Sequence, residues 1–193
     1  MIEAKKLNEL KDRAYKNAVA HGWHDEDLSN EHFLCLVISE LMEAVEADRI
    51  GKYANRNNFE YYMKQRKRDD DEFIYAFKHD IKDSVEDEFA DACIRLLDLA
   101  GLRNVDLGEV TLDDLKCSEG FFDWTFTESI FFLVCNLTNT DFIETHSFGS
   151  YLRVALMEII GFFVKKDIDI FWYIEQKMKY NELRPFMHGG KAY

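Results

Sequence analysis

The sequence predicts an all-α protein, and three observations support that class. The 193-residue chain has one proline, Pro185, near its C-terminus, so no proline ring interrupts a helix before that point. Apolar residues recur every three or four positions along most of the chain, which is the spacing of one helical face. No segment shows the strict alternation of a half-buried strand. With 47% hydrophobic residues, residues 1–193 are expected to form a single helical domain around one core.

The first two expected helices have clear ends. The first helix ends before Gly22, the residue type favoured just past a helix C-terminus. The second begins at an N-cap formed by Ser29 or Asn30 and ends before Gly51. The apolar stripe of the first consists of Leu7, Leu10, Ala14 and Ala18, and that of the second of Leu34, Val37, Ile38, Leu41 and Val45.

Residues 52–80 are expected to form a solvated helix face or a loop. The basic run KQRKR at 64–68 is followed directly by DDDE at 69–72, so that neighbouring charges neutralise one another. A third well-marked helix follows and is expected to end at Gly101. Its apolar stripe consists of Val85, Phe89, Ala92, Cys93, Leu96 and Ala100.

Three further helices are expected after a polar connection at 102–120. Thr125 and Glu128 have the spacing of a capping box at the start of the fourth helix. The three apolar stripes consist of Ile130, Leu133, Val134 and Leu137; of Leu152, Ala155, Leu156, Ile159 and Phe163; and of Ile170, Ile174 and Met178.

The charge balance limits the classes of partner. The chain has 37 acidic and 24 basic residues, and its net charge is −13. This charge opposes the phosphate neutralisation on which nucleic-acid binding depends, so no nucleic-acid partner is expected. The carboxylates would also repel a polyphosphate ligand unless divalent cations lay between them.

Neither a leader segment nor a membrane span is indicated. The N-terminal segment is charged and amphipathic, and no apolar stretch approaches membrane-spanning length without charges. The protein is therefore expected to be cytoplasmic, without a membrane partner. The cysteines have no Cys-x-x-Cys spacing and are expected to be reduced core residues: Cys35, Cys93, Cys117 and Cys135.

Two pairs of acidic residues form the candidate metal site. Glu40 and Glu43 lie in the second helix, and Glu88 and Asp91 in the third, each pair at i, i+3 and therefore on one side of its helix. If the two helices pack antiparallel, the four carboxylates can face one another, and they then require cations. Oxygen ligands favour Mg²⁺ or Mn²⁺ over zinc.

A solvated surface is the alternative interpretation of this spacing. Glu9 and Asp12, among others, have the same i, i+3 spacing in this acidic chain. The two chosen pairs differ because they lie in the two helices with the strongest apolar stripes. Six acidic residues also fall between Asp80 and Asp91, with Lys82 as the sole basic residue among them. Such crowding is unfavourable unless a cation relieves it.

At this point the motifs resemble a known family. The segments VISELMEAVEADRIG (37–51) and SVEDEFADACIRLLDLAG (84–101) resemble the EExxE and ExxD signature of the MazG-like all-α nucleoside triphosphate pyrophosphohydrolases. The likeness extends to NAVAHGWHDEDLSNEH (17–32) and KMKYNELRPFMHGGKAY (177–193). It implies a helical bundle with a four-helix core plus additional C-terminal helices, assembled as a dimer or higher oligomer.

The resemblance also implies residue roles. Glu40, Glu43, Glu88 and Asp91 correspond to the Mg²⁺ ligands, and Glu40 or Glu43 would accept the proton of the attacking water. The tail would contact the nucleotide and its phosphates through Lys177, Tyr180, Asn181 and Arg184. For Lys177 and Arg184, capping of a helix C-terminus is the alternative.

Two aromatic residues are candidates for stacking on a base. Trp23 and Tyr180 each offer an aromatic face, with core packing or anchoring of a helix end as the alternative. The chain departs from the family signature at Ser39, where the first glutamate of EExxE would stand, and in its tail, HGGKAY. Residues 102–168 have no counterpart in the resemblance.

The expected function is magnesium-dependent hydrolysis of a (deoxy)nucleoside triphosphate to the monophosphate and pyrophosphate. The alternative is a catalytically degenerate helical module that binds nucleotides or another protein. A di-iron carboxylate bundle is the third class considered, but it requires Glu-x-x-His pairs, which the chain lacks.

Overall fold

The computed structural model describes residues 4–66, 69–108, 124–139 and 147–186, and these residues form helices and no strand. The all-α prediction is therefore confirmed. The helices are α1 (Ala4–Ala20), α2 (Asn30–Arg49), α3 (Arg56–Gln65), α4 (Asp70–Asp80), α5 (Val85–Leu102), α6 (Phe126–Leu137), α8 (Phe148–Val164) and α9 (Ile170–Glu182).

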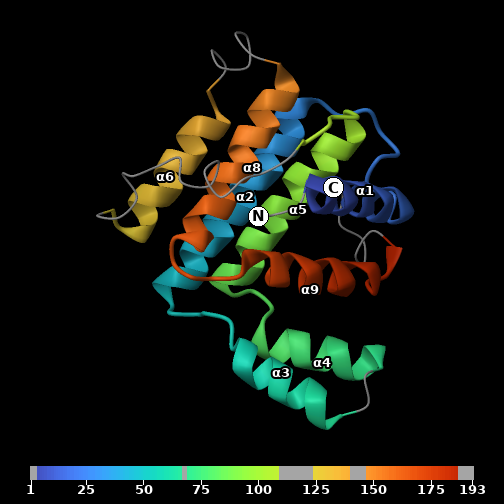
Figure 1. The fold of residues 1–193 in the computed structure, drawn as a ribbon, viewed down its shortest axis with the longest axis vertical. Coiled ribbons are helices and arrows are strands. Elements are labelled where there is room, and N and C mark those ends of the chain that lie inside the picture. The colour runs from blue at the N-terminus through green and yellow to red at the C-terminus, as the bar shows by residue number, and fades with distance from the viewer. Residues whose placement is uncertain (1–3, 67–68, 109–123, 140–146, 187–193) are drawn as a thin grey trace.

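Helix α5 lies at the centre of the arrangement and packs against α1, α2, α8 and α9 (Figure 1). α6 lies beside α8, and the α3–α4 hairpin forms one end of the molecule next to α9. α2 and α5 run antiparallel, because Arg103 just after α5 donates to Asn30 at the start of α2, while Glu86 at the start of α5 accepts from the backbone of Ala54 beyond α2. This is the orientation on which the predicted metal site depends.

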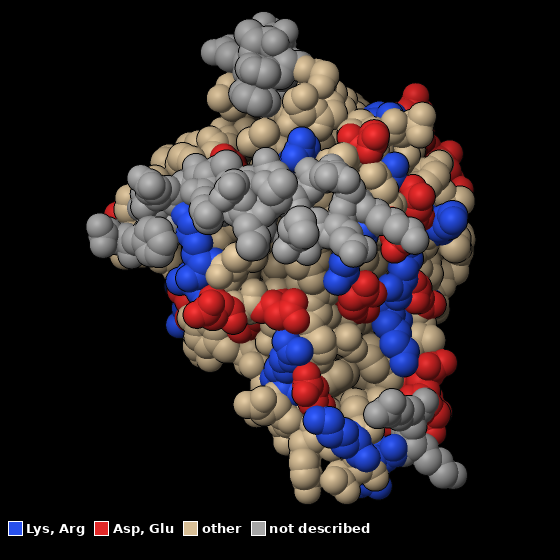
Figure 2. All heavy atoms as spheres, viewed as in Figure 1, with Lys and Arg blue, Asp and Glu red and all other residues tan. Residues whose placement is uncertain are grey.

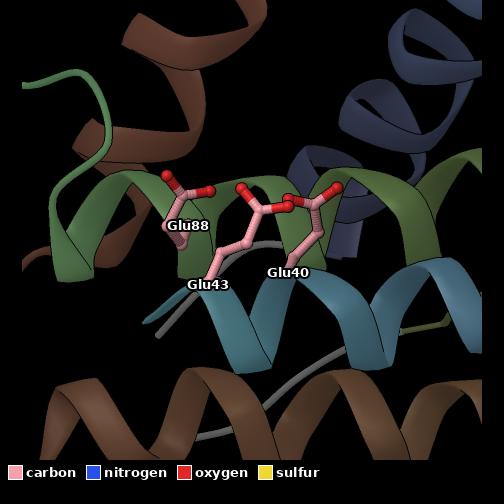
Figure 3. Close-up of side chains that lie close together, drawn as sticks. All are labelled: Glu40, Glu43 and Glu88. Carbon is pink, nitrogen blue, oxygen red and sulfur yellow. The ribbon is translucent and has the colours of Figure 1, made fainter. Parts of the chain in front are cut away.

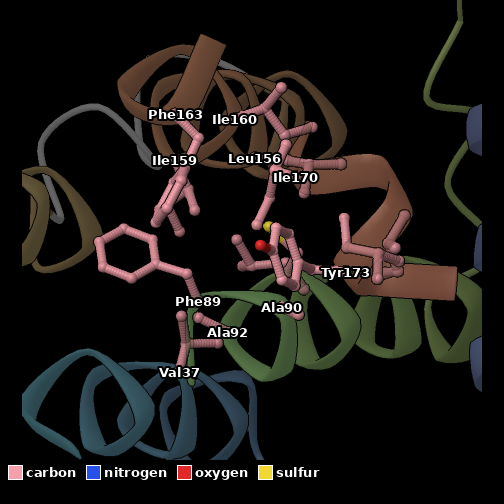
Figure 4. Close-up of a cluster of buried hydrophobic side chains, with 14 of the residues drawn as sticks. Val37, Phe89, Ala90, Ala92, Leu156, Ile159, Ile160, Phe163, Ile170 and Tyr173 are labelled. Carbon is pink, nitrogen blue, oxygen red and sulfur yellow. The ribbon is translucent and has the colours of Figure 1, made fainter. Parts of the chain in front are cut away.

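One part of the hydrophobic core lies between α5 and α8 (Figure 4). Phe89 is fully buried, and its ring centroid lies 4.5 Å from that of Phe163. Ile159 and Ile160 of α8 and Ile170 at the start of α9 are buried in the same cluster. Each such side chain contributes about 1.5–3 kcal/mol relative to an exposed one. This packing fixes α5, so that its opposite flank can carry polar groups.

The predicted N-caps are confirmed and refined. Ser29 rather than Asn30 caps α2, because its side chain accepts a hydrogen bond from the backbone of His32. The capping box of Thr125 and Glu128 is present at the start of α6. Gly22 and Gly51 follow α1 and α2 with positive φ angles of 81° and 68°, as expected for residues that end helices.

Gly101 does not end α5, contrary to the prediction. The helix continues to Leu102, and the residue with positive φ is Asn104, at 52°. A Cβ atom on Gly101 would lie 2.5 Å from the Cβ of Tyr15 in α1. The glycine is therefore needed for the close approach of α1 to α5, a reason that helix-end statistics do not reveal.

Residues 52–80 form two helices, so the expectation of a loop was wrong, and only the expectation of a solvated helix face was partly right. Phe59 of α3 and Phe73 of α4 are buried, and their ring centroids are 5.8 Å apart. The ring of Phe59 also contacts Trp172 of α9. α3 ends at Gln65 within the basic run, whose residues 67 and 68 lie outside the described residues, and the acidic run begins α4 with Asp69 as its N-cap. The change from basic to acidic residues therefore coincides with the end of α3 and the start of α4, which the interpretation as neutralised charge did not predict.

Only one of the three described cysteines is a core residue. Cys93 is buried, whereas Cys35 on α2 and Cys135 on α6 are exposed, and all three are free thiols. Cys117 lies outside the described residues. Cys35 stands between Leu34 and Leu36 on the outward side of the amphipathic α2, so a neighbouring apolar residue was a poor guide to its burial.

Charged side chains of both signs are interspersed on the described part of the face shown in Figure 2. Ion pairs among the described residues include that of Arg13 with Glu182 and that of Arg49 with Glu46. Within the described segments, no helix is both long and apolar enough to cross a membrane.

Candidate functional site

Three carboxylates from α2 and α5 converge on one point (Figure 3). Glu40, Glu43 and Glu88 each place an oxygen atom within 4.8 Å of the others. The antiparallel packing brings the middle of α2 beside the first turn of α5, where Glu88 lies. Glu40 is 5% and Glu88 4% exposed, while Glu43 is exposed. The predicted antiparallel meeting of the two acidic flanks is therefore present for three of the four residues.

Burial and mutual repulsion disfavour the charged forms of this group. Burial raises the pKa of Glu88 to about 9. Burial, followed by the negative charge of Asp91, raises the pKa of Glu40 to about 7, although Arg95 opposes the shift. Without a cation, Glu88 therefore holds a proton at neutral pH. A divalent ion that replaces this proton would allow all three carboxylates to ionise together.

Asp91, the fourth predicted ligand, is not part of this group. Its Oδ2 lies 2.7 Å from Nζ of Lys177 on α9, and its Oδ1 accepts a hydrogen bond of 3.4 Å from Asn181. Burial acts to raise the pKa of Asp91, but the neighbouring Lys177 charge and hydrogen bond outweigh it, and the pKa is lowered. Asp91 is therefore already paired with a cation of the protein itself.

A second acidic group was not predicted. Asp83, Asp87 and Glu88 also place oxygens within 4.8 Å of one another. Asp87 is fully buried and accepts from Nζ of Lys177 at 2.8 Å and from the backbone of Asp83 at 2.8 Å. Asp83 pairs with Lys82. Because this group has lysine partners, it is less suited to a metal ion than Glu40, Glu43 and Glu88. The i, i+4 spacing of Asp83 and Asp87 was the signal that could have revealed it.

One cavity of about 310 Å³ is lined by every residue that the sequence singled out for the site. These residues come from the turn after α1, from α2, α5 and α9, and from the segment after α9: Trp23, Glu40, Glu43, Glu88, Asp91, Lys177, Tyr180, Asn181 and Arg184. Leu28, Phe33, Leu36 and Ile94 also line the cavity. It therefore combines an acidic part with an apolar part.

The tail residues line the cavity, and two of them, Lys177 and Tyr180, also have partners within the protein. Lys177 lies within α9, is 4% exposed and pairs with Asp87 and Asp91, so the alternative of a helix cap was wrong for it. Tyr180 is buried, and its ring stacks on Phe77 of α4 with centroids 4.4 Å apart. One face of Tyr180 therefore serves packing, as its alternative interpretation expected.

Arg184 and Trp23 lie near the place where the segment after α9 meets the turn after α1. The backbone carbonyl of Arg184 contacts the ring of His21 at 3.0 Å, and its guanidinium lies over Tyr180, 5.9 Å from the ring centroid. Trp23 is half-buried beside this junction. The rest of the tail motif, from residue 187 onward, lies outside the described residues.

Sequence reasoning missed two further charged residues of the cavity. Nε of Arg95 donates to Oε1 of Glu40 at 2.5 Å, and Asp98 contacts the ring of His24 at 2.8 Å. Burial raises the pKa of Asp98. Both residues continue the flank of α5 that carries Asp91, at i+4 and i+7, so helical spacing could have placed them there.

Comparisons with known proteins find no family model, no curated protein and no solved structure that matches the chain. The role of the cavity must therefore be inferred from its own chemistry. The group of Glu40, Glu43 and Glu88 offers carboxylate oxygens, the ligand type that Mg²⁺ and Mn²⁺ prefer.

Proposed function

We propose that the protein is a MazG-like, magnesium-dependent hydrolase that converts a (deoxy)nucleoside triphosphate to the monophosphate and pyrophosphate. The observation that carries the proposal is the convergence of Glu40, Glu43 and Glu88 in a cavity that also has an apolar part. The acidic part suits phosphates bridged by cations, and the apolar part suits a base. Assembly as a dimer or higher oligomer belongs to the same proposal.

Glu40, Glu43 and Glu88 would hold the Mg²⁺, and Mn²⁺ could replace it. The bound ion would polarise the α-phosphate and lower the pKa of a water molecule. The all-oxygen group fits this role because burial, together with repulsion from neighbouring carboxylates, raises the pKa values of Glu40 and Glu88, even though Arg95 pairs with Glu40. A cation between them would relieve that repulsion.

Of the two glutamates considered as proton acceptor, Glu43 is the better placed. It is exposed and forms no ion pair or hydrogen bond with the described residues, whereas Oε1 of Glu40 is held by Arg95. Glu43 would take the proton of the attacking water while the bond between the α and β phosphates breaks and pyrophosphate leaves. Arg184, which also lines the cavity, would bind phosphate oxygens.

A panel of ribo- and deoxyribonucleoside triphosphates tests the proposal, with pyrophosphate release measured with and without Mg²⁺. Glu88→Gln removes one ligand charge and is expected to lower kcat/KM by about 100-fold or more, which corresponds to about 2.7 kcal/mol. Glu46→Gln is the matched control, because Glu46 is exposed on α2 and pairs with Arg49 away from the cavity. Absence of pyrophosphate release from every triphosphate, with Mg²⁺ and with Mn²⁺, would exclude the proposed reaction.

A catalytically degenerate nucleotide-binding or protein-interaction module is the second candidate. It is favoured by the internal cations already present on two predicted ligands, Arg95 on Glu40 and Lys177 on Asp91. This candidate predicts that Mg²⁺ does not raise the melting temperature and that no triphosphate is cleaved.

A further inference from the structure

Arg95 lines the cavity and has hydrogen-bond donors without a partner among the described residues. It lies on α5 one turn after Asp91 and one turn before Asp98, and its side chain is 34% exposed. Its Nε donates to Glu40. Among the described residues, neither of its terminal guanidinium nitrogens has a hydrogen-bond partner. Arg95 thus has two unused donors in the cavity.

Arg95 differs in this respect from Lys177. The Lys177 ammonium is buried and held by two carboxylates, Asp87 and Asp91, so it is fixed between α5 and α9. Arg95 contacts a single carboxylate through one nitrogen, and that carboxylate belongs to the candidate metal group. Of these two cations, Arg95 is the one whose partner a metal ion would take.

The position of Arg95 also matches one part of a nucleotide. Glu40 lies next to Glu43 and Glu88 in the acidic part of the cavity, whereas Ile94, the neighbour of Arg95 in sequence, lines the apolar part. A nucleotide with its base in the apolar part and its phosphates at the carboxylates would bring the phosphate nearest the sugar to Arg95. Guanidinium groups bind phosphate oxygens in pairs through neighbouring nitrogens.

Metal binding would change the partner of Arg95. A divalent ion attracts Glu40 more strongly than a singly charged guanidinium does at a similar distance. Arg95 would then be a partly buried cation without a counterion, which is unfavourable. An anionic phosphate at the same place removes this penalty.

We infer that Arg95 is a nucleotide-binding residue: Glu40 holds its guanidinium in the metal-free protein, and it turns to the phosphate next to the sugar when Glu40 ligates a divalent ion. This inference rests on the proposed function. Under this inference each ligand raises the affinity for the other. Mg²⁺ frees Arg95 from Glu40, and the phosphate, by binding Arg95, frees Glu40 for Mg²⁺.

Isothermal titration of the Arg95→Gln variant tests this inference. The probes are MgCl₂ alone, and then, in saturating Mg²⁺, the α,β-imido analogues of the nucleoside triphosphates and the matching nucleosides. Arg95→Gln is expected to bind Mg²⁺ alone several-fold more tightly, because the competing cation is gone. It should bind the analogues about 10- to 100-fold more weakly, while its affinity for the nucleosides stays unchanged.

Two further variants control for charge and folding. Arg95→Lys keeps the charge but loses the paired donors, so its affinities should lie between those of the wild type and Arg95→Gln. Arg49→Gln removes an exposed arginine of α2 that pairs with Glu46 outside the cavity, and both affinities should match the wild type. If circular dichroism shows that Arg95→Gln does not fold, Arg95→Lys is compared with the wild type instead.

Opposite results would overturn the inference. Arg95 is only a structural counterion if Arg95→Gln binds the analogues as tightly as the wild type. The proposed exchange of Arg95 from Glu40 to the phosphate is wrong if Arg95→Gln binds Mg²⁺ alone no more tightly than the wild type does. If Arg95→Gln weakens binding of the analogues but the wild type releases no pyrophosphate from true triphosphates, the proposed hydrolysis is contradicted and the nucleotide-binding role of Arg95 is supported. If the wild type hydrolyses a triphosphate but Arg95→Gln does not change analogue binding, the proposed hydrolysis is supported and the nucleotide-binding role of Arg95 is contradicted.

Discussion

At the scale of single residues, the site is a set of buried charges that must be balanced. Glu40 and Glu88 are about 95% removed from solvent, and each depends on a neighbour or a proton for neutrality. Asp87 and Asp91 instead share Lys177. The protein thus provides its own cation for the second pair, whereas the ion pair that the described residues form with the Glu40, Glu43 and Glu88 group is that of Arg95 with Glu40.

Lys177→Met should destabilise the fold strongly. The change leaves Asp87, which is fully buried, and Asp91 without their cation. Removing one partner of a buried ion pair costs about 3–5 kcal/mol. Chemical denaturation measures the loss in the free energy of unfolding. Lys64→Met on the exposed end of α3 is the control and should change it by less than about 0.5 kcal/mol.

A double variant separates charge from packing in this prediction. Asp87→Asn combined with Lys177→Met removes one of the two stranded negative charges and should recover part of the lost stability. If the double variant is no more stable than Lys177→Met, the ammonium acts through packing and the ion-pair explanation is wrong.

At the scale of helices, α5 performs three tasks that require different residues on its different sides. One side packs Phe89 against α8. The flank that lines the cavity carries Glu88, Asp91 and Arg95. Gly101 allows α1 to pack closely against α5. A single helix therefore connects the core, the candidate metal group and the cavity wall. Its substitutions should separate these tasks.

Gly101→Ala should weaken the packing of α1 on α5 although alanine favours helices. The new Cβ would meet the Cβ of Tyr15 at 2.5 Å, and the nearby backbone oxygen of Lys11 at 3.3 Å, so α1 must shift. Overpacking of this kind costs about 1–3 kcal/mol. Thermal melting measures the effect, with Val19→Ala on an exposed position of α1 as the control. A melting temperature equal to or above that of the wild type would show that α1 moves aside freely.

The helices that could be predicted are those whose apolar stripe spans several turns. α2, α5 and α8 have such stripes and bury them, so their spacing was sufficient. The short α3 and α4 bury only a few aromatic residues each, and their charged ends hid that pattern.

The site could be predicted only in part, for a similar reason. Helical spacing placed Glu40, Glu43 and Glu88 on adjoining flanks once α2 and α5 were assumed to pair. The partnership of Lys177 with Asp87 depends on where α9 crosses α5, which no local pattern contains. Contacts between distant segments therefore had to come from the structure.

At the scale of the whole molecule, the net charge of −13 makes the acidic cavity costly at high pH. The folded-state pKa of Glu88 is about 9, and its ordinary value is 4.5. The folded protein therefore binds this proton more tightly than the unfolded chain does. The metal-free protein should accordingly lose stability as the pH rises from about 4.5 to about 9. Glu40, with a pKa of about 7, adds to the loss over the lower part of this range.

Mg²⁺ should reverse this loss, because it competes with protons for the same oxygens. The increase in melting temperature caused by Mg²⁺ should be small near pH 5, where Glu40 and Glu88 hold protons, and should grow towards pH 9. Melting curves across this range, with MgCl₂ or with a chelator, measure the difference. Glu88→Gln has no proton to release at this position, so its metal-free stability should depend less on pH. A Mg²⁺ effect that is absent, or equal at pH 5 and pH 9, would show that these carboxylates do not form the metal site.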